Sequence, residues 1–292
     1  MATISSDIRK NHVAALPCWA EGGEFKTTQV NGLNLRYLDV GQGQPLVLLH
    51  TIRSQLDYFQ KLIPELAKHY RVYALDLPAH GHSDIPDLAY DKPMFVGFVT
   101  GFIRSLGLEN VSLMGESIGA SISLSIAAEK KVTVKQVIAL NPAEYEHSNG
   151  LDRSSMLGKL LFSCITLPML GYMIANGENP IILRKVFEGG FNDKSQLPRH
   201  FITEMSKQGK RQGYAKAFRS IFLNWQTWTN KLELYADIEA PVRLIYSDND
   251  WSLRSEREAN RQRIPSAELV ILPDCGHFSA LENPRDILSA IL

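Results

Sequence analysis

The pattern G-x-S-x-G occurs at residues 115–119, with Ser117 at its centre. An apolar run at 111–114 precedes it, and a helix-like run at 117–129 follows. A sharp turn from strand to helix holds its central residue in a strained conformation and presents the side chain at a helix N-terminus, where negative charge is favoured. The two glycines lack Cβ atoms and let neighbouring backbone approach. The pattern therefore predicts that Ser117 is a nucleophile.

A serine hydroxyl attacks well only when a base takes its proton. Of the eight histidines, His277 is placed best, in a loop after the last predicted strand and before the last predicted helix. A carboxylate must orient that base and stabilise its charged form. Asp250 follows the predicted strand 241–246, and Asp248 in the same loop is the alternative. We predict Ser117, Asp250 and His277 as the catalytic residues.

Attack on a carbonyl also creates an oxyanion that needs hydrogen-bond donors. The backbone N–H of Ile118, directly after the nucleophile, is the first predicted donor. The second is expected from the loop after the predicted strand 46–50, with Ile52 preferred and Thr51 possible. Glu116, beside the nucleophile, is expected to hold a structural hydrogen bond.

Alternating strand and helix patterns surround these residues. Two alternating runs flank Asn31-Gly32, a hairpin signal. Continuous apolar runs, which are typical of strands buried on both faces, are interspersed with helical periodicity. We expect strands at 25–30, 33–40, 46–50, 71–76, 111–115, 134–140, 241–246 and 268–272, and helices at 55–68, 93–106, 117–129, 214–228 and from Pro284, with Asn283 as its N-cap. The alternation predicts the α/β class, with a mostly parallel central sheet flanked by helices.

Five spaced motifs together resemble the α/β-hydrolase superfamily. Besides the serine motif they are LLHTI at 48–52, DLPAHGHSD at 76–84, SDND at 247–250, and GHF at 276–278 followed by ENP at 282–284. Residues 1–24 show no periodicity and are expected to form an N-terminal arm. The resemblance implies a hydrolase core at 25–142 and 237–292 and an inserted helical cap at 143–236. Thr51, Ala79 and Ser247 stand where the family pattern has glycine. Epoxide hydrolases and haloalkane dehalogenases of this superfamily use an aspartate nucleophile, whereas a serine stands here.

Composition excludes several classes of protein. The 292 residues carry 31 Lys plus Arg and 31 Asp plus Glu, so no basic surface for nucleic acid is expected. Three scattered cysteines predict neither a disulfide framework nor a zinc site, and no metal or organic cofactor is expected. The N-terminus does not resemble a secretory signal, and residues 156–175 are interrupted by polar residues. We expect a cytoplasmic monomer or homodimer without stable membrane insertion.

The predicted reaction is hydrolysis of a carboxylic ester through an acyl-enzyme, with an apolar group in the substrate. Phe218, Phe222 and Trp225 are candidate pocket residues in the predicted cap, and Arg53 is a candidate anchor for a substrate anion. The same apolar cap residues could contact lipid, although packing within the protein is the preferred interpretation. A thioester, lactone, amide or C–C bond remains an alternative substrate. A receptor that binds ligand with little or no turnover is a further alternative.

Overall fold

The computed structural model describes residues 17–146, 148–177 and 179–292. Its centre is an eight-stranded sheet with the order β1-β2-β4-β3-β5-β6-β7-β8. Strands β1 and β2 and strands β2 and β4 pair antiparallel, whereas all later pairs are parallel. The predicted fold class is confirmed. The strands are β1 (Glu24–Val30), β2 (Leu33–Gly41), β3 (Pro45–Leu49), β4 (Arg71–Leu75), β5 (Val111–Glu116), β6 (Val134–Leu140), β7 (Val242–Ser247) and β8 (Ala267–Leu272).

Local sequence explains where these strands turn and why they are buried. Asn31 and Gly32 both have positive φ, as a tight hairpin between β1 and β2 requires. Strand β5 is buried at every position because its neighbours cover both edges and helices cover both faces. The carboxyl ends of parallel strands β3, β5, β6, β7 and β8 therefore meet at one edge of the sheet, where the predicted catalytic loops begin.

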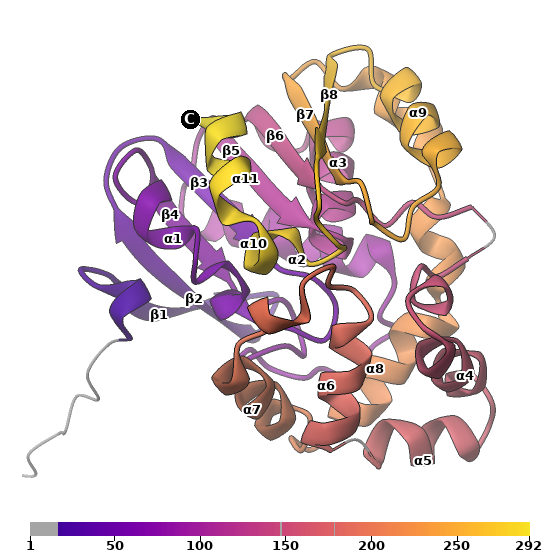
Figure 1. Cartoon of the computed structure of the whole chain (residues 1–292). Helices are drawn as coiled ribbons and strands as arrows, with labels where there is room; N and C mark the ends of the chain where they lie inside the picture. Colours follow the sequence, from indigo (N-terminus) through magenta and orange to yellow (C-terminus); the bar gives the residue numbers. More distant parts are fainter. Residues whose placement is uncertain (1–16, 147, 178) are drawn as a thin grey trace, which may run out of the picture.

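Helices lie on both faces of the sheet (Figure 1). On one face are α2 (Lys92–Ser105) and α3 (Ile118–Glu129), and on the other are α1 (Ile63–Leu66) and α11 (Pro284–Ile291). Helix α9 (Arg254–Arg263) follows β7, and the short α10 (Ser279–Glu282) precedes α11. The Asn283 side chain accepts a hydrogen bond from the Asp286 N–H, which confirms the predicted N-cap.

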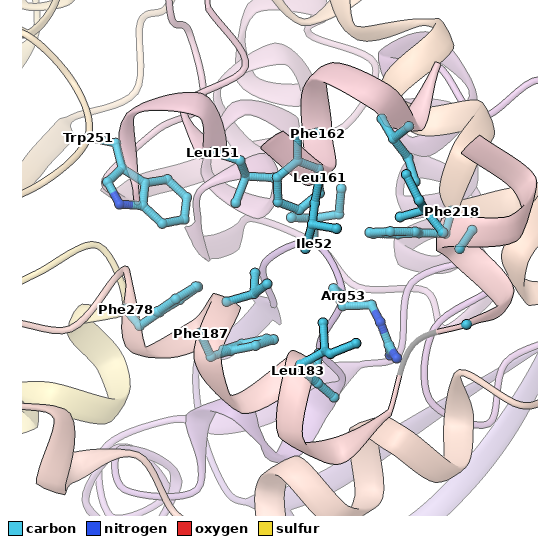
Figure 2. A pocket seen from close by; sticks show the side chains of 16 residues that line it. Ile52, Arg53, Leu151, Leu161, Phe162, Leu183, Phe187, Phe218, Trp251 and Phe278 are labelled. Carbon is cyan, nitrogen blue, oxygen red and sulfur yellow. The ribbon is translucent and has the colours of Figure 1, made fainter. Parts of the chain in front are cut away.

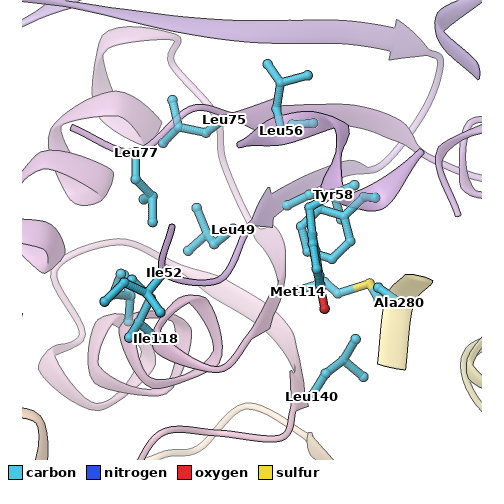
Figure 3. Close-up of a cluster of buried hydrophobic side chains, with 14 of the residues drawn as sticks. Leu49, Ile52, Leu56, Tyr58, Leu75, Leu77, Met114, Ile118, Leu140 and Ala280 are labelled. Carbon is cyan, nitrogen blue, oxygen red and sulfur yellow. The ribbon is translucent and has the colours of Figure 1, made fainter. Parts of the chain in front are cut away.

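The main hydrophobic core lies between the sheet and these helices. Leu49, Met114 and Leu140 come from three neighbouring strands, and Ile52 and Ile118 belong to the same buried cluster (Figure 3). Burial of such side chains stabilises the fold by roughly 1.5–3 kcal/mol each. The core therefore supports the residues directly around the serine motif.

Between β6 and β7 the described residues form helices and loops without a strand. We call residues 143–236 the inserted segment; its extent and its role as a cap stay predictions. Figure 1 shows α4 to α8 of this segment grouped on one side of the sheet, whereas η6 packs against α3. They are η3 (Leu151–Arg153), α4 (Met156–Ile165), α5 (Leu170–Asn176), α6 (Pro180–Glu188), η4 (Lys194–Gln196), α7 (Arg199–Gln208), α8 (Tyr214–Leu223), η5 (Trp225–Thr229) and η6 (Leu232–Asp237).

Two helices differ from the sequence-based expectation. Residues 55–68 form a 3-10 helix, η2 (Leu56–Phe59), and the single turn α1 rather than one helix. The Asp76 carboxylate accepts the Leu56 N–H, and Pro64 starts a new turn. The expected helix 214–228 ends at Leu223, where the Asn224 side chain bonds back to the Ser220 carbonyl. Tertiary and side-chain hydrogen bonds outweigh local periodicity at both places.

The predicted arm at 1–24 falls mostly outside the described residues, which begin at residue 17 with the 3-10 helix η1 (Cys18–Ala20) and the start of β1. In the part of the chain that the structure describes, every helix is too short or too polar to cross a bilayer. That part also holds no cluster of three or more His, Cys, Asp or Glu side chains suited to a metal ion.

Candidate active site

Ser117 lies in a sharp turn between β5 and α3. Its φ is +56° and its ψ is −118°, a backbone conformation that residues other than glycine rarely adopt. A Cβ at Gly115 would collide with the Gly119 carbonyl, and one at Gly119 would collide with the Leu49 carbonyl. The two glycines therefore let the turn close tightly and bring the first turn of α3 against the end of β3.

His277 and Asp250 form the strongest polar pair at this edge of the sheet. The imidazole Nδ1 donates to Asp250 Oδ1 at 2.5 Å, and both side chains are fully buried. Asp250 Oδ2 also accepts hydrogen bonds from the N–H and the hydroxyl of Ser252. Burial raises the pKa of Asp250, but the charge and hydrogen bond of His277 and the Ser252 bonds outweigh it and lower the pKa below its usual value. Asp250 thus stays ionised and selects the tautomer of His277 with an unprotonated Nε2.

Asp248, the alternative acid, has a different role. Its carboxylate accepts the backbone N–H groups of Asp274 and Cys275 at 3.0 and 3.1 Å. These bonds hold the loop that leads to His277. The structure therefore brings Asp250 to the imidazole and assigns Asp248 to the support of the loop.

Nε2 of His277 is buried and has no hydrogen-bond partner within the described residues. In particular, it makes no hydrogen bond with Ser117 Oγ. A buried acceptor without a hydrogen bond lowers the stability of the folded protein. Such acceptors are found at active sites, where a general base must be able to take a proton from the substrate or the nucleophile. Catalytic hydrogen bonds are often long or absent before substrate binds, and rotation about χ1 of Ser117 moves its hydroxyl. The bond between nucleophile and base stays a prediction.

A buried network ties the strand ends together below these residues. The Glu116 carboxylate accepts the N–H and hydroxyl of Ser279, the N–H of Ala280 and the side-chain N–H of Asn141. Asn141 also donates to the backbone carbonyl of His277 at 2.9 Å. Burial raises the pKa of Glu116, while its hydrogen bonds and the charge of His277 oppose that rise. Glu116 therefore makes structural hydrogen bonds that join β5, β6 and the His277 loop.

The predicted oxyanion loop follows β3 and is held from within. Buried His50 donates from Nδ1 to the Thr51 carbonyl and accepts the Leu77 N–H at Nε2. Burial lowers the pKa of His50 to about 4, so the ring is neutral. The positive φ in this loop falls on Arg53, at +59°, rather than on β-branched Thr51. Ile118 and Ile52 lie in one buried cluster, and their assignment as oxyanion donors stays a prediction.

Sequence reasoning missed Trp251. Its indole stacks on His277 with ring centroids 3.8 Å apart and planes at 13°, and its Nε1 donates to the Gly189 carbonyl. Tyr145 was missed too, and its hydroxyl lies 3.5 Å from His277 Nδ1. The position of Trp251 directly after Asp250 is a signal that could have found it. Tyr145 carries no comparable signal.

A cavity of about 200 Å³ lies against Trp251 and Phe278, whose rings contact that of His277 (Figure 2). Ser117, Asp250 and His277 are not among the residues that line it. Its wall combines Ile52 and Arg53 of the predicted oxyanion loop with Trp251, Phe278 and helices of the inserted segment. Among the described residues of this wall, Arg53 carries the one charge, and its guanidinium donates to the Met205 carbonyl and lies over the Tyr214 ring. The wall is otherwise apolar, which suits an apolar substrate group.

The predicted pocket aromatics separate into two sets. Phe218 lines the cavity. Phe222 packs behind the wall, with its ring 4.9 Å from that of Phe162, and Trp225 stacks on Phe222. The helix break after Leu223 turns Trp225 away, so that its Nε1 donates to the Ser148 carbonyl.

A sequence profile described as the alpha/beta hydrolase family matches residues 46–290. This chain belongs to that family. The matched range contains the strained serine turn, the Asp250–His277 pair and the inserted segment.

Members similar to this chain differ in the reactions for which they are named. A 2-hydroxy-6-oxo-6-(2'-aminophenyl)hexa-2,4-dienoic acid hydrolase of Metapseudomonas resinovorans is 22% identical over 266 residues, which cover 89% of this chain and 87% of the relative. A soluble epoxide hydrolase of Corynebacterium sp. (strain C12) is 30% identical over 290 residues, with 90% and 94% covered. The crystal structure of a membrane phospholipase A superposes with a TM-score of 0.75 at 25% identity and covers 93% of this chain and 85% of the phospholipase. The family therefore establishes a hydrolase without deciding which bond it cleaves.

Proposed function

We propose that this hydrolase cleaves a carboxylic ester with an apolar acyl group through an acyl-enzyme on Ser117. The observation that carries the proposal is the buried Asp250–His277 hydrogen bond, which leaves Nε2 as an unpaired base at the edge of the sheet where Ser117 lies. The apolar cavity against Trp251 and Phe278 supports an apolar acyl group.

In the proposed reaction, His277 Nε2 takes the Ser117 proton as Oγ attacks the ester carbonyl carbon. The N–H groups of Ile118 and Ile52 hold the oxyanion, and each such donor contributes roughly 10²–10³-fold to kcat. When the C–O bond breaks, Nε2 returns the proton to the leaving alcohol. Water then attacks acyl-Ser117 with His277 again as base, which releases the carboxylic acid and restores the serine.

The residue at the centre of the sharp turn, Ser117, favours an ester over an epoxide or a haloalkane as the substrate. Those two reactions use an aspartate nucleophile in this superfamily, and Ser117 supplies a hydroxyl in its place. Among the relatives, the name phospholipase A denotes an enzyme of carboxylic ester bonds. That likeness supports the ester assignment, and the apolar wall of the cavity agrees with it.

A fluorophosphonate probe with gel readout tests the nucleophile. We expect the wild type to be labelled and Ser117→Ala to show no labelling, with kcat on p-nitrophenyl esters reduced at least about 10³-fold. Ser121→Ala, at a buried serine one turn along α3, is the matched control and should keep its labelling. Labelling that persists in Ser117→Ala would refute the nucleophile. Tight ligand binding without a burst or turnover in the wild type would favour the receptor alternative.

Cleavage of a C–C bond is the second candidate, favoured by the dienoic acid hydrolase relative and by Arg53 in the cavity wall. Hydrolysis of a conjugated 6-oxo-dienoic acid breaks a C–C bond, and its carboxylate would need a cation. Arg53→Gln should then lower kcat/KM on such an acid far more than on a neutral p-nitrophenyl ester. Equal losses on both substrates would remove Arg53 as an anion anchor.

A further inference from the structure

An apolar surface covers the outer side of the inserted segment. We define the apolar patch by six exposed side chains on α4, α5, the link between them and α6: Met156, Leu160, Met169, Tyr172, Met173 and Ile181. Met156 is 91% exposed, Met169 82% and Ile181 75%. Most of the large apolar side chains that the described chain exposes lie in this segment, whereas the others, such as Leu88 and Leu253, are scattered. Exposed apolar side chains concentrated in one stretch of the chain in this way indicate a binding surface.

The same three helices are apolar on their inner side as well. Leu161 and Phe162 of α4, Ile174 of α5, and Ile182 and Leu183 of α6 line the cavity. Figure 2 labels Leu161, Phe162 and Leu183 among them. Helices α4 and α5 carry one charged residue, Lys159, whereas α6 carries Arg184, Lys185 and Glu188. A helix that is apolar nearly all round, as α4 and α5 are, is normally covered on every side by protein or by lipid. Here the inner side faces the cavity, and no described residue covers the six side chains of the outer side.

The charges around the apolar patch indicate what covers it. Residues 156–188, from the start of α4 to the end of α6, contain three basic residues, Lys159, Arg184 and Lys185, and two acidic residues, Glu188 and Glu178, the latter outside the described residues. Glu188 forms ion pairs with both Arg184 and Lys185. Lys159 is exposed on α4 beside Leu160, and no carboxylate of the described chain forms an ion pair with it. Exposed apolar side chains flanked by lysine are the combination that adsorbs to anionic lipid surfaces.

The length and position of the helices agree with contact in the plane of a lipid surface. Helices α4, α5 and α6 have 10, 7 and 9 residues, too short to span a bilayer. Figure 1 shows α4 and α5 at the edge of the molecule, with α5 remote from the sheet. Several short helices at one edge can together lay their outer sides on one surface.

We propose that the apolar patch docks on a bilayer that contains anionic phospholipid, and that an amphiphilic ester passes from that bilayer between α4, α5 and α6 into the cavity. The docking surface is independent of the reaction, whereas the passage of an ester rests on the proposed function. The apolar patch and the cavity are the outer and inner sides of one helical layer, so a lipid chain that leaves the bilayer needs to cross only that layer.

Vesicle co-sedimentation of the full chain tests the docking. We expect the wild type to bind vesicles of phosphatidylcholine with phosphatidylglycerol more tightly than vesicles of phosphatidylcholine alone, and less tightly at high salt. The double substitution Met169→Asp and Met173→Asp should weaken binding at least about tenfold. Leu88→Asp, at an exposed apolar residue outside the patch, is the matched control and should bind as the wild type does.

Two further measurements separate the possible failures. Ser117→Ala should bind the vesicles normally, and the double variant should hydrolyse a short soluble p-nitrophenyl ester at the wild-type rate while losing activity on a vesicle-borne ester. Vesicle binding without any ester hydrolysis would refute the proposed function and would still support the docking surface. Unchanged vesicle binding in the double variant would overturn the docking surface. A wild-type dimer that the double substitution dissociates, without vesicle binding, would instead assign the apolar patch to a second copy of the chain.

Discussion

Trp251 and His277 are in face-to-face contact at the point where the predicted chemistry needs a fixed imidazole. A ring 3.8 Å away limits rotation of His277 about its side-chain bonds and presents a π face to the imidazolium that the proposed reaction would form. Trp251 thus covers one face of the imidazole, and its neighbour Asp250 accepts a hydrogen bond from Nδ1 at the edge of the same ring. We therefore expect Trp251 to be a positioning residue.

Substitution of Trp251 should separate positioning from mere stability. We expect Trp251→Ala to lower kcat about tenfold, because an imidazole without its stacked partner is no longer held in one orientation. Trp251→Phe keeps a ring face and should recover most of the activity. The measurement is kcat and KM on one p-nitrophenyl ester, with circular dichroism as a check of folding. A kcat that is unchanged in Trp251→Ala, or a loss that Trp251→Phe does not recover, would leave Trp251 with a structural role alone.

The two aspartates of one loop give a second prediction at this scale. Asp250→Asn should reduce kcat about 10³–10⁴-fold, because the amide no longer favours the required tautomer of His277. Asp248→Asn should cost far less activity, since Asp248 binds backbone N–H groups of the loop and not the imidazole. Steady-state kinetics on one p-nitrophenyl ester compares them, and the reverse ranking would move the acid to Asp248.

Among the elements, α3 and β3 are packed so closely that a single methyl group decides whether they fit. Gly119 in the first turn of α3 faces the carbonyls of Leu49 and His50, and this contact sets the distance between the serine turn and the oxyanion loop. Gly97 in α2 offers a contrast, because a Cβ there would meet nothing within 4 Å.

A matched pair of glycine substitutions tests this contact. Gly119→Ala should destabilise the protein by about 2–3 kcal/mol and abolish activity, because backbone must move to accommodate the methyl group. Gly97→Ala should stabilise it by about 0.5–1 kcal/mol through helix propensity, with activity unchanged. Urea unfolding gives both values. A stable, active Gly119→Ala protein would mean that the contact is looser than described.

For the whole molecule, buried ionisable groups couple stability to pH. The pKa of His50 falls from 6.5 to about 4 on folding because burial disfavours the charged ring. A group whose native pKa is lowered in this way binds fewer protons folded than unfolded between these values. The contribution of neutral His50 to the free energy of unfolding is therefore fully present above pH 6.5 and is lost as the pH falls toward 4. The pKa of buried His80 is lowered to about 3, so His80 acts in the same direction.

We expect His50→Gln to flatten the decline of unfolding free energy between pH 6.5 and 4. Between pH 6.5 and 4 the free energy of unfolding of His50→Gln should fall by about 3 kcal/mol less than that of the wild type, at 1.36 kcal/mol per pKa unit. A glutamine side-chain oxygen can still accept the Leu77 N–H, which limits other losses. Urea unfolding at several pH values measures the slope. Asp57, whose pKa burial raises to about 7, works in the opposite direction in both proteins and cancels in the difference.

The sequence by itself determined those features that depend on neighbours along the chain. The hairpin at Asn31-Gly32, the alternation of strand and helix, the turn at Ser117 and the cap at Asn283 follow from local conformational preference and hydrophobic periodicity. The fold class followed from these elements, because parallel buried strands need helices on both faces.

Tertiary structure decided which side chains meet across long separations. Asp250 rather than Asp248 reaches His277, 27 residues away, because backbone N–H groups of the 273–277 loop bind the other carboxylate. Phe218 lines the cavity, whereas Trp225 turns away after a helix break that periodicity does not reveal. The stacking of Trp251 on His277 likewise depends on two loops arriving together. Such contacts are set by packing and hydrogen bonds between distant segments, whose energies no local pattern contains.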